Sequence, residues 1–231
     1  MAKERLGKLI ASTGRWSRRE VKTLVREGRV LVDGRIAGSA EEKYDAESCR
    51  IAVNGEELLL RRHTYVMLHK PAGVLSATED GRGRTVLDLL TPELRKIGVF
   101  PVGRLDKDTE GLLLLTDDGE LAHALLSPKK HVDKVYYARV SGRLAPEDCA
   151  AFEAGMTLGD GLECLPAGLE ILAAGETSEG KFHQVKRMLA ARGKPVTYLK
   201  RLSMGSLRLD DTLAPGEFRL LTAAEEAQLQ R

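Results

Sequence analysis

An aspartate in a short polar loop is the first candidate for chemistry in this chain of 231 residues. Asp106 lies within residues 103–111, Gly-Arg-Leu-Asp-Lys-Asp-Thr-Glu-Gly, and four leucines at 112–115 follow directly. A loop joined to a buried strand can expose a reactive group and still hold it in one place. A carboxylate held in this way can attack an electrophilic carbon or accept a proton. The chain offers few rival groups of catalytic residues.

The elements that must position this loop are predicted from the residue pattern. Residues 65–70 have the character of a strand that ends at Pro71, and the leucine run at 112–115 has that of a second strand. Residues 183–192 are predicted to form a helix that stops before Gly193. Thr109 is expected to shape the Asp106 loop through its hydroxyl group, and Gly111 by permitting a close approach of backbone.

The N-terminal segment is predicted to be a separate basic module. Residues 1–35 carry a net charge of +6, which leaves −4 for the rest of the chain. The pattern predicts a short helix that starts near Leu6, a second helix capped by Ser17 with Glu20 as its capping-box partner, and a hairpin that turns at residues 33–34. The uneven distribution of charge suggests that the N-terminal segment contacts a polyanion, although a basic face that contacts only solvent would give the same net charge. The basic residues expected to make this contact are Arg15, Arg18, Arg19, Lys22 and Arg26.

Trp16, beside these residues, has two interpretations. Its ring is suited to stacking on a base, but a tryptophan in such a module more often fills a small core or a domain junction. The sequence favours the structural role. The order of two short helices and a hairpin, with basic residues on the second helix, resembles the S4 RNA-binding module.

Composition excludes several other classes of function. The sequence shows no apolar stretch long enough to cross a bilayer and no signal-peptide core, so we expect a cytoplasmic protein with no membrane contact. No metal site is expected, because neither the five histidines nor the three cysteines have metal-ligand spacing. No phosphate-binding glycine loop is present either, so no cofactor is expected.

Four further motifs give the chain a family resemblance. HKPAGVLS, FPVGRLDKDTEGLLLLTDDGELAH, KVYYARVSG and EGKFHQVKRMLAARG occur in the order seen in RNA pseudouridine synthases, and with the S4-like start they most resemble the RsuA family. The resemblance implies an α+β fold: a small S4 domain at residues 1–60, then a catalytic domain at 61–231 with a mixed, largely antiparallel sheet, flanking helices and a central cleft.

The same resemblance assigns three catalytic roles. Asp106 is the family's reacting carboxylate, Tyr136 its base-stacking ring, and Lys186 the cation that holds the carboxylate ionised and fixed. Tyr137 follows directly and is expected on the opposite face of the strand. Converting uridine to pseudouridine breaks the bond from ribose C1′ to N1 and rejoins the base through C5, without net oxidation or reduction. The sequence does not decide whether Asp106 attacks the nucleoside or removes the C2′ proton to give a glycal.

Three more residues are expected to contact RNA, each with an alternative. Arg104 steadies the flipped nucleotide or a phosphate, or it forms an ion pair that fixes the loop. Arg187 reaches a phosphate, or it replaces Lys186 as partner of Asp106. His183, at the start of its helix, contacts RNA or caps the helix. Asp108 is expected to be a solvated loop residue.

One motif also predicts which ribosomal RNA is the substrate. The sequence motif HQVKRM resembles the small-subunit branch of the family. This resemblance implies that the substrate is 16S rRNA, at the uridine conventionally numbered 516, or a small-subunit assembly intermediate. A synthase for large-subunit 23S rRNA is the nearest alternative. A non-catalytic S4-type ribosome assembly factor is the alternative from a different class. We expect a monomer, since the sequence shows no heptad pattern that would indicate a coiled-coil oligomer.

Overall fold

The computed structural model describes residues 3–46, 48–127, 130, 132–173, 176–178 and 182–229. The chain divides into two compact units, and each is described by itself. The first unit comprises residues 1–64, 90–99 and 116–118. The second comprises residues 65–89, 100–115 and 119–231. None of the helices within these described ranges is long and apolar enough to cross a membrane.

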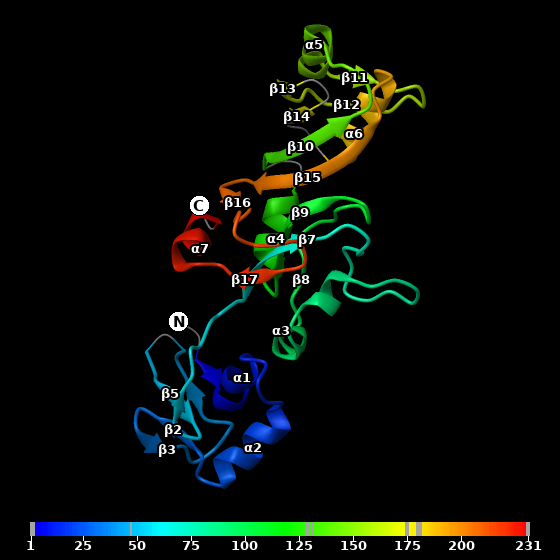
Figure 1. The fold of residues 1–231 in the computed structure, drawn as a ribbon. Coiled ribbons are helices and arrows are strands. Elements are labelled where there is room, and N and C mark those ends of the chain that lie inside the picture. Colours follow the sequence, from blue (N-terminus) through cyan, green and yellow to red (C-terminus); the bar gives the residue numbers. More distant parts are fainter. Residues whose placement is uncertain are drawn as a thin grey trace. The chain divides into compact units, whose positions relative to one another are not determined.

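In its described residues, the first unit contains three helices and two small sheets. Figure 1 labels the helices and several of the strands. Strands β3, β2, β5 and β6 form a four-stranded antiparallel sheet, and β1 pairs with β4. Its elements are β1 (Glu4–Arg5), α1 (Leu6–Ala11), α2 (Arg18–Arg26), β2 (Val30–Val32), β3 (Arg35–Ile36), β4 (Lys43–Tyr44), β5 (Ile51–Val53), β6 (Glu56–Glu57) and α3 (Pro92–Ile97).

The local predictions for this unit are confirmed. Ser17 caps α2, and its side chain and that of Glu20 form both hydrogen bonds of a capping box. The hairpin of β2 and β3 turns through Asp33 and Gly34, both in the left-handed region with φ of 50° and 77°. One contact has no sequence signal: a Cβ on Gly14 would lie 2.3 Å from the carbonyl oxygen of Glu93 in α3. Only glycine permits this approach, which packs α3, distant in sequence, against the segment between α1 and α2.

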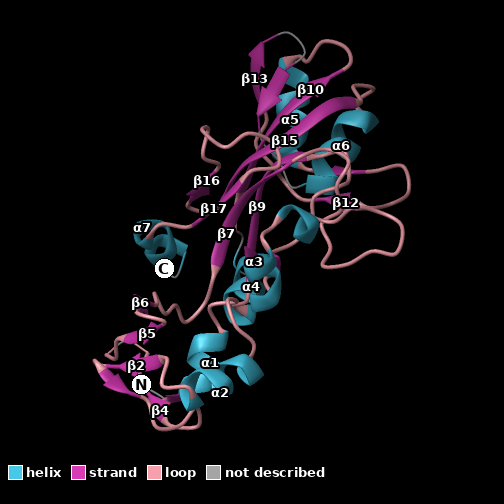
Figure 2. Cartoon of the chain, turned by 60° about the horizontal axis from the view of Figure 1, so that its bottom comes forward, coloured by secondary structure: helices cyan, strands magenta, loops and turns pink. Residues whose placement is uncertain are grey.

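In the residues that the structure describes, the second unit is built on a nine-stranded sheet (Figure 2). The strand order is β13-β14-β10-β15-β9-β7-β17, with β16 on β15 and β8 on β9. The β15–β9 pair is parallel, and the β13–β14, β14–β10, β10–β15, β15–β16 and β7–β17 pairs are antiparallel, so the mixed, largely antiparallel sheet of an α+β fold is confirmed. The elements are β7 (Tyr65–Lys70), a 3-10 helix η1 (Val86–Leu89), β8 (Phe100–Pro101), β9 (Glu110–Thr116), α4 (Gly119–Leu126), β10 (Lys134–Val140), α5 (Pro146–Ala154), β11 (Met156–Thr157), β12 (Glu163–Cys164), β13 (Glu170–Ala173), β14 (Glu176–Ser178), α6 (Phe182–Ala191), β15 (Val196–Met204), β16 (Leu207–Arg208), β17 (Phe218–Leu220) and α7 (Ala223–Leu229).

Helix α6 is anchored at both its apolar face and its C-terminal end. Val185 and Leu189 are buried as predicted, in a cluster that includes Phe152 of α5. Beyond the helix, Lys194 and Arg192 donate to the buried carboxylate of Asp148 at 2.6 and 2.8 Å. Burial alone would raise the pKa of Asp148, but these hydrogen bonds lower it to about 2. The helix that carries Lys186 is therefore tied to α5 by packing and by charge.

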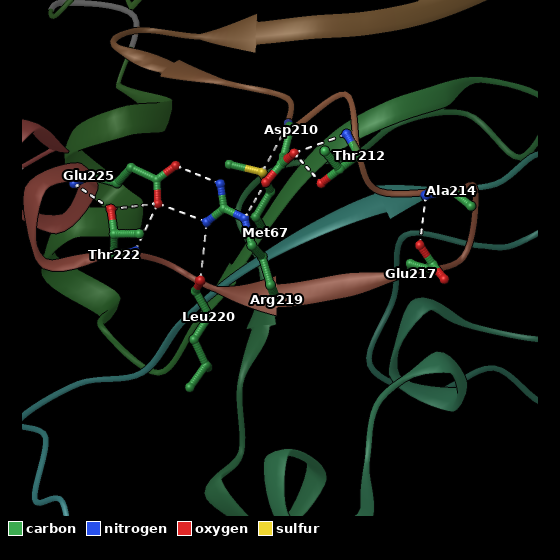
Figure 3. Close-up of polar contacts among 9 residues, drawn as sticks. All are labelled: Met67, Asp210, Thr212, Ala214, Glu217, Arg219, Leu220, Thr222 and Glu225. Carbon is green, nitrogen blue, oxygen red and sulfur yellow. Dashed lines mark hydrogen bonds and ion pairs between the residues drawn. The ribbon is translucent and has the colours of Figure 1, made fainter.

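The C-terminal segment is fixed to the sheet by an arginine with two carboxylate partners (Figure 3). Arg219 of β17 donates to Asp210 at 2.7 Å and to both oxygens of Glu225 at 2.8 Å. The backbone N–H of Asp210 also lies 3.4 Å from the sulfur of Met67 in β7. The Arg219 guanidinium lowers the pKa of Glu225 to about 2, and hydrogen bonds from Thr212 and Arg219 lower that of Asp210 to about 2. Both carboxylates thus favour the folded state only while ionised.

We expect Arg219→Gln to destabilise the protein by about 1–3 kcal/mol at pH 7, because charge-assisted hydrogen bonds to two partly exposed carboxylates are lost. Folded pKa values below the unfolded ones mean that this contribution is complete above pH 5 and is lost as the pH falls toward 2. The difference between wild type and variant should therefore shrink on acidification. Urea unfolding at pH 7, 4 and 3 measures it.

Arg208→Gln is the matched control, since Arg208 is an exposed arginine on β16 outside this network. Its stability difference from wild type should be small at each of these pH values. A deficit in Arg219→Gln that stays constant down to pH 3 would contradict the assignment of this contribution to the ionised carboxylates.

Candidate active site

The Asp106 loop connects β8 to β9, and its backbone is held at several points. The N–H of Thr109 donates to the carbonyl oxygen of Asp106 at 3.1 Å. Ser76 accepts from the N–H of Leu105 at 3.0 Å and donates to its carbonyl oxygen at 2.9 Å. The hydroxyl of Thr109 is buried without a hydrogen-bond partner among the described residues, so the prediction that it shapes the loop by bonding backbone is wrong. The main chain of Thr109 makes that contact.

Lys70, the last residue of β7, lies beneath the loop and is fully buried. Its Nζ donates to the carbonyl oxygens of Thr109 at 2.8 Å, Pro71 at 3.0 Å and Lys107 at 3.3 Å. Burial lowers the pKa of Lys70 to about 8, although the carboxylates of Asp108, Glu110 and Asp106 act in the opposite direction. A buried cation thus fixes the backbone on both sides of residue 108 and adds positive charge below the loop.

Lys186 of α6 meets the same loop with its ammonium group. Its Nζ lies 3.3 Å from Oδ2 of Asp106 and 2.8 Å from Oδ1 of Asp108. The Asp106 side chain is 28% exposed and that of Asp108 is 76% exposed. The hydrogen bond from Lys186 lowers the pKa of Asp108. Asp108 is solvated as predicted, but its ion pair with Lys186 was not predicted.

Tyr136 of β10 lies in the interior of the sheet, opposite Arg201 of β15. Both side chains are buried, and the two residues are register partners. Burial raises the pKa of Tyr136, and the charge of Arg201 opposes that shift. The charge of Asp106 also raises the pKa of Tyr136, so the phenol lies within electrostatic range of the carboxylate. Tyr137 lies on the other face of the strand, as predicted, with its ring centroid 6.1 Å from that of Tyr198.

The start of β9 approaches β15 closely because residue 111 is glycine. Gly111 has a φ of 103°, and a Cβ there would lie 2.2 Å from the carbonyl oxygen of Arg201. The predicted role of Gly111 in a close approach of backbone is confirmed. Arg201 in turn donates through Nε to the carbonyl oxygen of Leu112 at 2.7 Å. The loop therefore joins the sheet at a point where two strands and a buried arginine are locked together.

The other predicted RNA-contacting residues of this unit lie in different surroundings. Arg104 is exposed, and no ion pair in the described part of the chain fixes it. Arg187 pairs with Asp160 at 2.5 Å rather than with Asp106. The side chain of His183 lies outside the described residues.

The five basic residues predicted to bind RNA in the first unit fall into two groups. Arg18, Lys22 and Arg26 are exposed and follow one another at four-residue spacing along α2, which puts them on one face. Lys22 also pairs with Glu41 at 3.0 Å. Arg15 and Arg19 lie beside Trp16 instead, and Arg15 makes two hydrogen bonds to Glu56.

Sequence reasoning missed two buried cations next to the predicted site. Lys70 lies in the HKPAG motif, at the end of the predicted strand and directly before Pro71. Arg201 lies in the final long strand, and a charged residue at an inward position was its available signal. The site thus has a partly exposed carboxylate, that of Asp106, with the Lys186 cation beside it and the Lys70 cation beneath its loop. The phenol of Tyr136 and the guanidinium of Arg201 are buried behind it. In such a site a carboxylate can act as a nucleophile or a base with support from the protein's own side chains.

Comparisons with known proteins agree with this chemistry. A family model described as RNA pseudouridylate synthase matches residues 64–191, and an S4 domain model matches residues 4–48. The chain is 50% identical to the uncharacterised RNA pseudouridine synthase YtzG of Bacillus subtilis, over 96% of each chain.

Two further relatives carry names for different ribosomal subunits. Ribosomal small subunit pseudouridine synthase A of Vibrio cholerae is 39% identical, over 97% of this chain and 99% of its own. Ribosomal large subunit pseudouridine synthase B of Bacillus subtilis is 38% identical, over 98% of this chain and 96% of its own. Among solved structures, a crystal structure of a pseudouridylate synthase aligns with a TM-score of 0.67 and 35% identity, over 97% of this chain and 99% of the other.

Proposed function

The chain belongs to the family of RNA pseudouridine synthases that begin with an S4 domain, and from that premise we propose that it isomerises one uridine of ribosomal RNA, with Asp106 as the reacting group. The enzyme class follows from the family. The choice of Asp106, Tyr136 and Lys186 as its catalytic residues, and of its RNA target, is the proposal. The observation that carries it is the 3.3 Å contact between Asp106 and Lys186 on a loop fixed by Lys70.

In this scheme the chain's own residues supply the charge and the positioning. Asp106 either attacks the nucleoside or removes the C2′ proton, and in both cases it must be ionised. The ammonium group of Lys186, 3.3 Å from Oδ2 of Asp106, holds the carboxylate on one side of the loop. The bond between ribose C1′ and uracil N1 breaks, the base turns, and C5 forms the new bond to C1′. The C5 proton is lost and N1 gains one, so the reaction balances without a cofactor. Tyr136 is assigned the ring against which the base is held and a phenol near its reacting edge. Its side chain is fully buried in this structure, so this role requires the entering base to displace the atoms that cover the ring.

The target uridine must leave its stack before a carboxylate in a protein loop reaches its ribose. Arg104, exposed on the loop, is assigned to the flipped nucleotide or a phosphate, and Arg187 and His183 are assigned to the neighbouring RNA backbone. The proposed substrate is 16S rRNA, at the uridine conventionally numbered 516, free or in a small-subunit assembly intermediate. The small-subunit relative supports this choice, and the large-subunit relative keeps 23S rRNA as the second candidate.

The direct test is to incubate the protein with 16S rRNA, with small-subunit particles and with 23S rRNA, and to map pseudouridine by carbodiimide-dependent primer extension. One stop in 16S rRNA, absent with Asp106→Asn, is the expected result. A stop only in 23S rRNA would move the target to the large subunit. No stop in any of the three RNAs would contradict the enzyme proposal and favour the assembly-factor alternative. We also place the protein in the cytoplasm, as a monomer, with its S4 domain at residues 1–60 and its catalytic domain at 61–231.

The exposed face of Arg18, Lys22 and Arg26 is proposed to follow the phosphate backbone of the substrate. Each phosphate contact releases counterions and adds about 0.7–0.9 to the slope of log affinity against log salt concentration. Replacing all three residues by glutamine should therefore weaken binding and reduce that slope by up to about 2–3. Filter binding of 16S rRNA between about 50 and 200 mM salt measures it. Arg208→Gln, which removes one charge from the second unit, should leave the slope unchanged; an unchanged slope in the triple variant would remove this face from the RNA interface.

A further inference from the structure

A groove of about 440 Å³ lies on the first unit, beside the basic face of α2. One wall is a stripe along that helix together with Trp16, two residues before it. The other is formed by Arg29, just before β2, and Asn54, just after β5. The volume is within the range of sites that bind small ligands. The lining residues are Trp16, Arg19, Glu20, Thr23, Leu24, Glu27, Arg29 and Asn54.

Trp16, the chain's one tryptophan, is held in place before any ligand arrives. Its ring packs against the core of the unit and is partly exposed to the groove. The Arg15 guanidinium carbon lies 4.6 Å from the ring centroid, and Arg15 is fixed in turn by hydrogen bonds of 2.7 and 2.6 Å to Glu56. A flat ligand therefore meets a fixed aromatic surface, so that little side-chain freedom is lost on binding. The predicted structural role of Trp16 and a stacking role are compatible in this geometry.

The charges that line the groove cancel. Two arginines face two glutamates, and Arg29 is already bonded to Glu27 at 3.1 Å and to Asn54 at 2.7 Å. Glu20 accepts from the N–H of Ser17 at 2.6 Å. A phosphate group favours a site with excess positive charge, which the neighbouring Arg18, Lys22 and Arg26 face provides. A groove with no net charge, an aromatic wall and the polar side chains of Thr23 and Asn54 suits an uncharged heterocycle with hydrogen-bonding edges.

We infer that this groove binds one unpaired nucleobase of single-stranded RNA, stacked on Trp16, while the adjoining phosphate backbone follows the basic face of α2. The inference rests on RNA being the ligand of this protein, and it adds a base-binding site remote in sequence from the Asp106 loop. Bases of single strands stack on aromatic side chains regardless of sequence, whereas those of a duplex are already stacked on one another. The groove therefore selects an unpaired nucleotide in the substrate.

Trp16 itself reports on the groove, because the chain has no other tryptophan to add to the signal. The full-length protein is titrated with a nine-nucleotide single-stranded RNA of mixed A and C, labelled with fluorescein at its 3′ end. Saturable quenching of Trp16 emission is expected, with the same dissociation constant as the anisotropy of the label gives. The same strand annealed to its complement should quench little. Binding of the single strand with unchanged Trp16 emission would overturn the inference.

Variants separate stacking from mere proximity. Trp16→Phe keeps a flat ring and should lose little affinity, whereas Trp16→Leu should lose about 5- to 100-fold. Because Trp16 also packs against the core, Thr23→Met provides a test that leaves the ring in place: it fills the groove from the partly exposed face of α2 and should show the same loss. Ile36→Met, a neutral change on exposed β3 outside the groove, is the matched control.

The outcome is distinguishable from that of the proposed function. Unchanged single-strand affinity in both Trp16→Leu and Thr23→Met would refute the base-binding groove while pseudouridine formation continues. Loss of pseudouridine in Asp106→Asn, with Trp16 quenching intact, is the expected counterpart and locates the two sites independently.

Discussion

Replacing Asp106 by asparagine is expected to abolish pseudouridine formation while RNA affinity stays near the wild-type value. Asparagine has the size of aspartate and keeps one carbonyl oxygen, but it neither attacks carbon effectively nor accepts the C2′ proton. Removal of a reacting group of this kind costs about 10⁴-fold or more in rate. Both mechanistic alternatives for Asp106 predict this loss. Single-turnover rates on 16S rRNA, measured alongside filter binding, separate the two effects.

The loop is expected to keep its conformation in Asp106→Asn. The loop hydrogen bond of residue 106 uses its backbone carbonyl oxygen, and Lys186 retains its 2.8 Å contact with Asp108. Loss of activity in this variant would therefore report on the carboxylate and not on a displaced loop.

Asp108→Asn is the matched control, because Asp108 is a second carboxylate within reach of the same ammonium group. Its side chain is 76% exposed, whereas that of Asp106 is 28% exposed. An exposed ion pair contributes at most about 1 kcal/mol, so the rate should fall less than about tenfold. If Asp108→Asn were inactive and Asp106→Asn active, the roles of the two carboxylates would have to be exchanged.

Replacing Lys70 by methionine is expected to slow the reaction by about 10²- to 10³-fold without weakening RNA binding. Methionine fills similar space but donates no hydrogen bond, so the carbonyl oxygens of Lys107 and Thr109 lose their shared partner. Each such contact contributes about 1.5–3 kcal/mol, and about 1.4 kcal/mol corresponds to a tenfold change in rate. The loop would then no longer hold Asp106 in one position.

A pH profile distinguishes this positioning role from general destabilisation. With a pKa of about 8, Lys70 loses its proton within the working range of the assay. The wild-type single-turnover rate should therefore fall as the pH rises through 8, because the neutral amine has one donor fewer and no longer offsets the carboxylate charges above it. Lys70→Met should lack that descending limb. A rate within threefold of wild type, or an identical alkaline limb, would contradict the role assigned to Lys70.

The local elements of this protein were predictable because their causes are close together in the sequence. The Ser17–Glu20 capping box, the Asp33-Gly34 turn and the apolar face of α6 each depend on residues within a few positions of one another. The α+β fold and the enzyme class were implied by the resemblance of the four motifs to those of RNA pseudouridine synthases, and the comparisons agree.

The surroundings of the Asp106 loop depended on contacts between distant residues. Lys70 lies under the loop because β7 ends there in space, 39 positions before Thr109, and Arg201 faces Tyr136 through a register that no local pattern specifies. The sequence determined by itself which residues carry chemical groups, which helices and turns form, and that a carboxylate, a lysine and a tyrosine recur in a known order. Only the tertiary structure decided that Lys70 lies beneath the Asp106 loop and that Lys186 also pairs with Asp108, because burial, strand register and loop closure are set by residues far apart in the chain.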